Sequence, residues 1–150
     1  MGSEVWIWLI VSVAAVSLIG PISQLVARNH DQARVDMHTE VVRALVRTSA
    51  LLTPEQLRDE KHAVEYAVPG VYILFNERKQ WYYTGQAENM LERVEAQLAG
   101  GGNQTVYADY LAGDGYTIRM IPLEDSGLAT LDALERRVIL IYKAQYPDSP

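Results

Sequence analysis

The sequence contains no cysteine among its 150 residues. This absence excludes a disulfide framework, a zinc finger built on thiolates and a cysteine nucleophile, and it leaves the redox compartment undetermined. Histidine is scarce as well, since His30, His38 and His62 are the only three and lie far apart in the sequence. They do not have the spacing of metal ligands, so the sequence does not predict a histidine-based metal site.

Charge is missing from one long stretch near the N-terminus. No charged residue occurs between Glu4 and Arg28, a gap of 23 positions, and most positions in the gap are apolar. About 20 apolar residues are needed for a helix to cross the hydrocarbon core of a bilayer. Trp6 and Trp8 lie near one end, where amphipathic rings favour the membrane interface. A cleaved signal peptide fits poorly, because no basic segment precedes the apolar run.

We therefore expect residues 1–28 to be an N-terminal transmembrane anchor that contacts the lipid bilayer through residues 5–27, with a buried core helix as the alternative. The arginines near the apolar stretch all follow it: Arg28, Arg34, Arg43 and Arg47. The positive-inside rule then places the C-terminal part of the chain in the cytoplasm. The expected localisation is a single-pass membrane protein with a cytoplasmic C-terminal domain.

Residues 29–67 are expected to form a helical juxtamembrane linker. Apolar side chains recur at helical spacing over residues 31–52, which predicts a helix there. The same region carries an imperfect heptad pattern that includes His38 and Ser49. Because two polar members weaken a coiled coil, we expect this helix to pack on the domain that follows.

A second, short helix is expected at the end of the linker, up to about Tyr66. Thr53 is a suitable N-cap residue, and Pro54 suits the first helical position. Gln56 can complete a capping box with Thr53.

The composition changes at residue 68, where a domain of residues 68–150 is expected to begin. Two strand-like runs with a polar turn between them predict an antiparallel hairpin over residues 70–84. The remaining expected elements are helices over 87–98, 106–111 and 128–146, and a strand over 116–121. This order describes an α+β fold, with a small three-stranded antiparallel sheet flanked by helices.

Two tripeptides in the hairpin carry a resemblance. Gly70-Val71-Tyr72, followed by Tyr83-Thr84-Gly85, resembles the paired motif of the GIY-YIG nuclease family. Arg93 lies eight positions after Gly85, where that family has an arginine on its first helix, and Glu135 lies in a context similar to the family's metal-binding glutamate on the last long helix. The resemblance covers about 80 residues, 68–147, and its element order agrees with the pattern above.

The resemblance implies a metal-dependent endonuclease that hydrolyses phosphodiester bonds of DNA. Tyr83, or Tyr72 in partnership with it, would act as the base or orient the attacking water. Such a phenol needs a lowered pKa, and a nearby metal and Arg93 would push it that way. Arg93 would hold the scissile phosphate, and Glu135 would bind a single Mg²⁺ or Mn²⁺.

The same resemblance implies a substrate-binding set around these residues. Gly70 and Gly85 would allow close approach of the backbone beside the site. Gln97 lies four positions after the arginine, where the family has His or Tyr; it can hydrogen-bond but is a poor acid or base. Arg136 is the fourth member, with a solvated helix face as its alternative role.

Other readings of these residues remain open. The two tyrosines could be cross-strand core packing, and Arg93 with Glu135 could be an ordinary ion pair. Gln97 departs from the family pattern, and the expected asparagine after the last helix is missing. The alternative function is therefore a catalytically weakened module that serves as a binding or assembly subunit of a membrane complex.

Charge is the main objection to a nucleic acid substrate. The chain has 13 Lys and Arg against 19 Asp and Glu, a net charge of −6. The 68–150 region alone has 7 against 11, a net charge of −4. Nucleic acid binders usually display a basic surface. We expect low intrinsic affinity for DNA, so that a protein partner or a homo-oligomer would help to deliver the substrate, such as DNA entering the cell.

Overall fold

The structure is a computed structural model that describes the backbone of residues 4–147 and 149, with side chains described at residue 24 and from residue 27 onward. The expected transmembrane anchor, with its bilayer contact over residues 5–27, therefore lies almost entirely outside the described side chains. Within the part that is described, no helix is long and apolar enough to cross a membrane. The contacts of the chain divide it into two units, Met1–Met37 and His38–Pro150.

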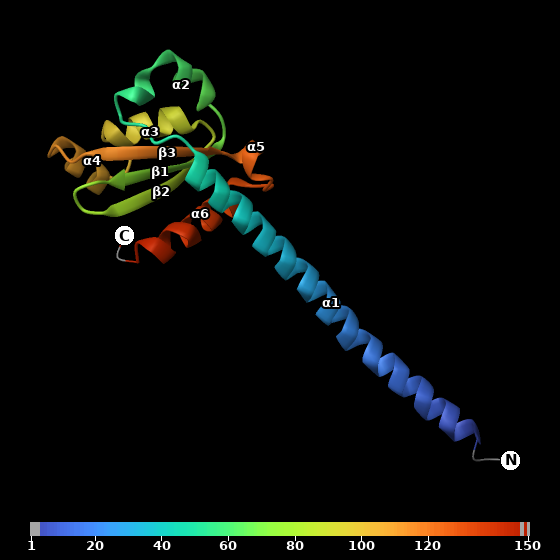
Figure 1. The fold of residues 1–150 in the computed structure, drawn as a ribbon. Helices are drawn as coiled ribbons and strands as arrows, with labels where there is room; N and C mark the ends of the chain where they lie inside the picture. Colours follow the sequence, from blue (N-terminus) through green and yellow to red (C-terminus); the bar gives the residue numbers. More distant parts are fainter. Residues whose placement is uncertain (1–3, 148, 150) are drawn as a thin grey trace. The chain divides into compact units, whose positions relative to one another are not determined.

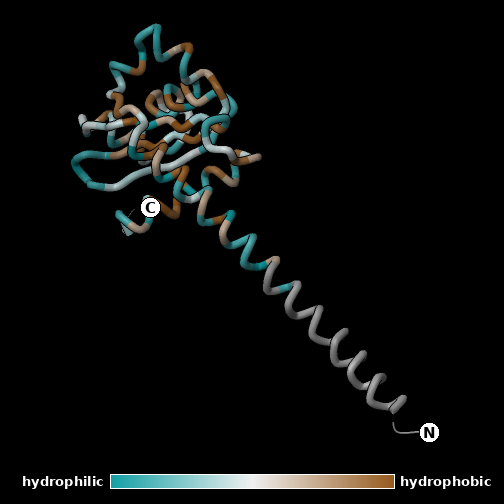
Figure 2. The backbone as a smooth tube through the Cα atoms, turned by 45° about the vertical axis from the view of Figure 1, so that its right-hand side comes forward, coloured by the Kyte–Doolittle hydropathy of each residue, from teal (hydrophilic) through white to brown (hydrophobic). Residues whose placement is uncertain are grey.

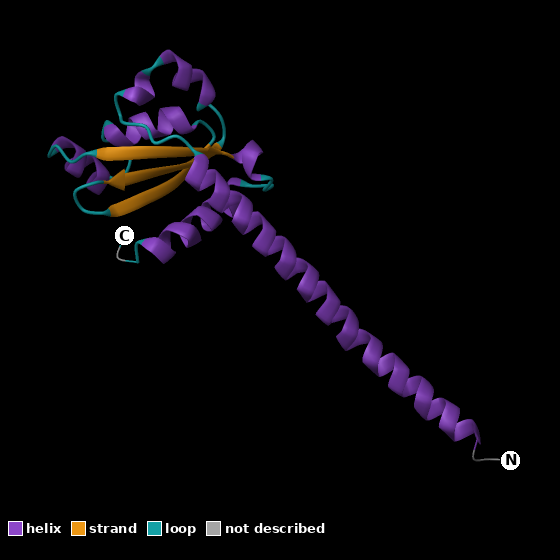
Figure 3. Ribbon diagram, viewed as in Figure 1, coloured by secondary structure: helices purple, strands orange, loops and turns teal. Residues whose placement is uncertain are grey.

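The larger unit is α+β (Figures 1 and 3), as the sequence predicts. Its sheet consists of three antiparallel strands in the order β2-β1-β3. The strands are β1 (Gly70–Asn76), β2 (Trp81–Ala87) and β3 (Tyr116–Pro122). α1 (Glu4–Thr48) begins in the smaller unit, and its residues from His38 onward belong to the larger one. The other helices are η1 (Gln56–Arg58), α2 (Glu60–Glu65), α3 (Met90–Leu98), α4 (Gln104–Leu111), α5 (Leu123–Ser126) and α6 (Leu131–Gln145).

Side chains alternate along β1, so each face of the sheet has its own core. One face presents Tyr72 and Leu74 to α3 and α4, together with the segment that contains η1. The other face presents Val71 and Ile73 to α6 and to the last turns of α1. Figure 2 shows hydrophobic residues, in brown, on the strands and on the helices beside them.

The end of α1 packs on the sheet, as the sequence predicts for the helix over residues 31–52. Val42 and Val46 are buried in the same cluster as α6. The helix ends at Thr48, earlier than expected. The reason is Leu52, which exchanges two backbone hydrogen bonds of 2.9 and 2.8 Å with Ile118 on β3 and is therefore extended.

Two other helix boundaries differ from the sequence expectation. The capping box forms, because Gln56 N–H donates to Thr53 Oγ1 and Thr53 N–H donates to Gln56 Oε1. The single short helix that we expected is nevertheless divided into η1 and α2, because Asp59 between them is extended, with ψ 137°. The helix expected from residue 87 begins at Met90, since Asn89 is its N-cap and accepts from the N–H of Glu92.

The last helix also begins later than its expected start at residue 128. Thr130 is its N-cap, with Oγ1 accepting from the N–H of Ala133 at 3.2 Å. The short α5 between β3 and α6 was not expected from the sequence.

Candidate active site

Tyr72 is the centre of the candidate site. It lies in the middle of β1, the central strand, and is 1 % exposed. Its register partner on β2 is Gly85, and a Cβ at Gly85 would overlap the Tyr72 hydroxyl. The phenol therefore lies across Gly85, and the absence of a side chain there is what gives it room.

Two residues of α3 face this phenol. Residues 93 and 97 are one turn apart, so their side chains project from the same side of the helix. Gln97 is fully buried, and its Nε2 donates to Tyr72 Oη at 2.9 Å. Arg93 is exposed, and its guanidinium lies close enough to Tyr72 to lower the pKa of the phenol. The structure thus brings together three of the residues that the sequence singles out.

Tyr83 on β2 joins the same group. Its ring centroid lies 6.3 Å from that of Tyr72, with the two planes tilted by 39°. The pKa of Tyr72 is raised overall, because burial outweighs the opposing effects of the Gln97 hydrogen bond and of Arg93. A tyrosine that acts as the base needs a lowered pKa, and these protein groups do not lower the pKa of Tyr72.

Glu135 lies on α6, the helix that covers the opposite face of the sheet. The first turns of α6 contact the β2 edge, where Gln86 Nε2 donates to Asp132 Oδ1 at 2.6 Å. Among the described residues, no ion pair joins Glu135 to Arg93, so the ordinary ion pair considered for them is not formed. Arg136 is exposed, and its Nε donates to the backbone carbonyl of Asp132 at 3.1 Å.

The fit of a metal ion rests on Glu135 and its neighbour Asp132. Burial, and then the negative charge of Asp132, raise the pKa of Glu135. A cation would relieve both effects. No cluster of three or more His, Asp or Glu able to hold a metal occurs in the described part of the chain. Mg²⁺ is often held by one or two carboxylates with waters and substrate phosphates, so Glu135 fits a site of that sparse kind.

The space beside Gly70 is filled by other residues of the protein, so it does not offer room for a substrate. A Cβ at this position would meet the Met90 side chain and the backbone carbonyl of Ile121. The role of Gly70 in the structure is therefore close contact between the start of β1 and α3.

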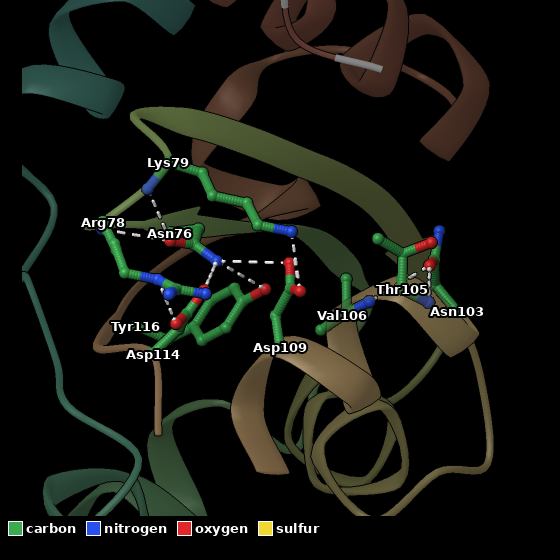
Figure 4. A network of polar contacts seen from close by, with 9 residues as sticks. All are labelled: Asn76, Arg78, Lys79, Asn103, Thr105, Val106, Asp109, Asp114 and Tyr116. Carbon is green, nitrogen blue, oxygen red and sulfur yellow. Dashed lines mark hydrogen bonds and ion pairs between the residues drawn. The ribbon is translucent and has the colours of Figure 1, made fainter. Parts of the chain in front are cut away.

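A second polar cluster lies at the other end of β1 (Figure 4). The Asn76 side chain is 1 % exposed; its Oδ1 accepts from the N–H groups of Arg78 and Lys79, and its Nδ2 donates to Asp114 at 2.8 Å. Arg78 pairs with Asp114, and Lys79 pairs with Asp109 at 2.7 Å. The pKa of Asp114 is lowered, first by the Asn76 hydrogen bond and then by Arg78 and Lys79.

This cluster fastens the hairpin turn to α4 and to the start of β3. Its charged side chains form ion pairs with each other, so we assign the cluster a role in stabilising the fold. Sequence reasoning assigned residues 76–79 and 113–115 only to turns, because nothing local in the sequence indicates that they meet. Asp132 lies one turn before Glu135 on the same helix, so its effect on Glu135 is a local signal that the helical spacing of the sequence contains.

The geometry therefore gathers Tyr72, Tyr83, Arg93 and Gln97 on one side of the sheet, with Glu135 on a helix that reaches the β2 edge. Comparisons of the chain with models of known protein families, with curated proteins and with solved structures found no match.

Proposed function

We propose that the chain is a membrane-anchored, metal-dependent endonuclease of the GIY-YIG type, which hydrolyses phosphodiester bonds of DNA with its C-terminal domain in the cytoplasm. The observation that carries the proposal is that Tyr83 and Arg93 lie beside Tyr72, whose phenol lies against Gly85. These are the residue types that the two motifs and the arginine spacing imply, and two antiparallel strands and one helix place them together.

Each residue has a defined task in this proposal. Arg93 binds the scissile phosphate, because its planar fork of donors matches phosphate oxygens. Tyr83, or Tyr72 in partnership with it, orients the attacking water or accepts its proton. Glu135 would hold Mg²⁺ or Mn²⁺, which supplies Lewis-acid stabilisation of the charge that develops on the phosphate oxygens.

The charge of the domain sets how it meets its substrate. With a net charge of −4 over residues 68–150, the domain repels DNA at long range. We propose that affinity is low and falls steeply with salt, and that a protein partner or a second copy of the chain helps to deliver the strand. An anchor over residues 1–28 would place the site beside the membrane, where DNA entering the cell first arrives.

A second candidate function rests on Gln97. This side chain is fully buried with both ends hydrogen-bonded, and the pKa of its partner Tyr72 is raised. Neither feature favours Tyr72 as the base that accepts a proton from the attacking water. A catalytically weakened module that binds a protein or DNA within a membrane complex would keep the same fold without cleavage.

Cleavage assays separate the two candidates. The full chain is incubated with single- and double-stranded DNA and Mg²⁺ or Mn²⁺, beside the variants Arg93→Ala and Glu135→Gln. Arg58→Ala and Glu124→Gln are matched controls, because both side chains are exposed and neither belongs to the site. The nuclease proposal expects cleavage by the wild type and both controls, and a loss of about a hundredfold or more in the two site variants. Equal background in all five proteins would contradict it and favour the binding module.

A further inference from the structure

The orientation of the Gln97 amide is fixed by the chain itself. Its Oε1 lies 2.6 Å from the backbone nitrogen of Asn103, and its Nε2 lies 2.9 Å from Tyr72 Oη. A backbone N–H can only donate, so the Gln97 atom that faces Asn103 has to be the oxygen. The amide nitrogen is therefore the atom that faces the phenol, and the usual ambiguity of a glutamine side chain does not arise here.

This orientation decides the direction of the hydrogen bond at Tyr72. An amide nitrogen only donates, so Tyr72 Oη is the acceptor and its own proton points elsewhere. Arg93, the charged neighbour of the phenol, also has only donors. Tyr83 brings a further hydroxyl proton, so the group formed by Tyr72, Tyr83, Arg93 and Gln97 has more donors than acceptors. Such a group fits an anionic acceptor from outside the protein.

Packing prevents the two side chains from turning away. A Cβ at Gly102 would overlap the Gln97 amide, so the loop before α4 lies directly against it. Gly85 lies equally close to the Tyr72 hydroxyl. Both ends of the hydrogen bond are thus confined by backbone, and the direction of donation is built into the fold.

We propose that Gln97 is a positioning residue that keeps Tyr72 a hydrogen-bond donor, so that Tyr72 and Arg93 together bind one phosphodiester anion and the base is Tyr83. The inference rests on the proposed function, because it assigns the substrate contact within the same site. It is carried by the donor geometry, which would serve phosphodiester binding whether or not the bond is then cleaved.

The groups around the phenol allow a test by pH. Those that titrate or carry charge against Tyr72 are Tyr83 on β2 and Arg93 on α3. Tyr66 and Tyr116 belong to the same core cluster, and burial raises the pKa of both, that of Tyr66 to about 12. Because these pKa values are raised, Tyr66 and Tyr116 stay protonated between about pH 5 and about pH 8. A carboxyl introduced at position 97 is expected to change charge within that range.

The experiment measures binding of a thymidine dinucleotide to the full chain by NMR titration, with a chelator present so that no metal-dependent cleavage occurs. The variant Gln97→Glu is compared with Gln104→Glu, which makes the same change at an exposed position nearby. Near pH 8 the buried carboxylate accepts a hydrogen bond from the Tyr72 hydroxyl, so that this O–H no longer points to the ligand, and we expect Gln97→Glu to bind about tenfold more weakly than wild type. Near pH 5 the protonated carboxyl donates as the amide does, and we expect binding within about twofold of wild type.

A double-variant cycle separates this effect from simple charge repulsion. Tyr72→Phe should weaken binding about tenfold at both pH values, because the donor is gone. Adding Gln97→Glu to Tyr72→Phe should then change binding by less than about twofold. The same tenfold loss in both backgrounds, or equal loss at both pH values, would overturn the inference. If Gln97→Glu does not fold, Tyr72→Phe decides alone, and unchanged binding in that variant overturns the inference.

The outcomes also distinguish this inference from the proposed function. Binding that follows the expected pattern, with no cleavage under any metal, contradicts the nuclease proposal and supports phosphodiester binding by Tyr72 and Arg93. Cleavage by wild type with unchanged dinucleotide binding in both variants, or no dinucleotide binding by wild type, removes the donor role of Tyr72.

Discussion

Replacing Gly85 with alanine puts a methyl group where the Tyr72 phenol lies. An ideal Cβ on Gly85 would overlap the Tyr72 hydroxyl and would lie 2.5 Å from the Cζ atom of the ring. The ring cannot move aside, because Tyr72 is 1 % exposed and Gln97 holds its hydroxyl at 2.9 Å. We expect Gly85→Ala to lower the free energy of unfolding by about 2–3 kcal/mol, as overpacking of a dense core does.

The cause of this loss can be isolated by combining variants. Tyr72→Phe alone leaves the Gln97 amide nitrogen without its acceptor, at a cost of about 1–2 kcal/mol. In the double variant the closest overlap disappears with the hydroxyl, so we expect the combined loss to be smaller than the sum by about 1 kcal/mol. Gly113→Ala gives the cost of backbone strain without overlap for comparison, because Gly113 has φ 88° and a Cβ there would meet nothing within 4 Å, whereas Gly85 does not have a positive φ.

Urea denaturation of the full chain, followed by near-ultraviolet circular dichroism, measures these differences. The signal reports the packing of aromatic side chains, and a shift in midpoint at constant slope gives the change in stability. A Gly85→Ala protein within about 0.5 kcal/mol of wild type would refute the steric reasoning. A double variant whose loss equals the sum would refute the assignment of the overlap to the hydroxyl.

Three further predictions concern the rest of the fold. Val42→Ala should cost about 2 kcal/mol in thermal denaturation, because Val42 is fully buried against α6, whereas the half-exposed Val41→Ala should cost less than about 0.5 kcal/mol. Asn76→Ala should cost about 3 kcal/mol in urea denaturation, since it removes the partner of two backbone N–H groups and of a buried carboxylate. The pKa of Asp114 is lowered, so its carboxylate stabilises the fold above about pH 3.9 and loses that effect as pH falls through the folded-state pKa. Asp114→Asn should therefore make the free energy of unfolding fall less steeply below about pH 3.9 than it does in wild type. The same fall in both proteins would contradict this.

The sequence predicts the sheet well because the information for it is local. The two short runs of strand-favouring residues in β1 and β2 and the polar turn between them predict the hairpin, and its register brings Tyr72 opposite Gly85. The capping box at Thr53 and Gln56 is local too, and it forms. Boundaries fail where a distant partner decides the backbone: Leu52 is extended because it pairs with β3.

The parts of the site that the sequence misses depend on contacts between distant segments. Asn76 donates hydrogen bonds to Asp109 and Asp114, which lie 33 and 38 residues away in the sequence, and no local pattern predicts these contacts. In the sequence, Gln97 is notable only as a departure from the motif that the two tripeptides resemble, and its buried hydrogen bond to Tyr72 depends on the three-dimensional fold. The raised pKa of Tyr72 likewise follows from burial, which the two tripeptides do not encode.

The bridge between Leu52 and Ile118 bears on where the folded unit can be cut. A sheet edge with free N–H and C=O groups is a template for pairing with other chains. Leu52 occupies part of the outer edge of β3, and Ser149 accepts the N–H of Tyr82 on the opposite edge strand at 3.2 Å. The segments at residues 52 and 149 thus cover part of the two edges of the sheet. A fragment that began at residue 68 would keep all three strands yet expose the edge of β3 to self-association.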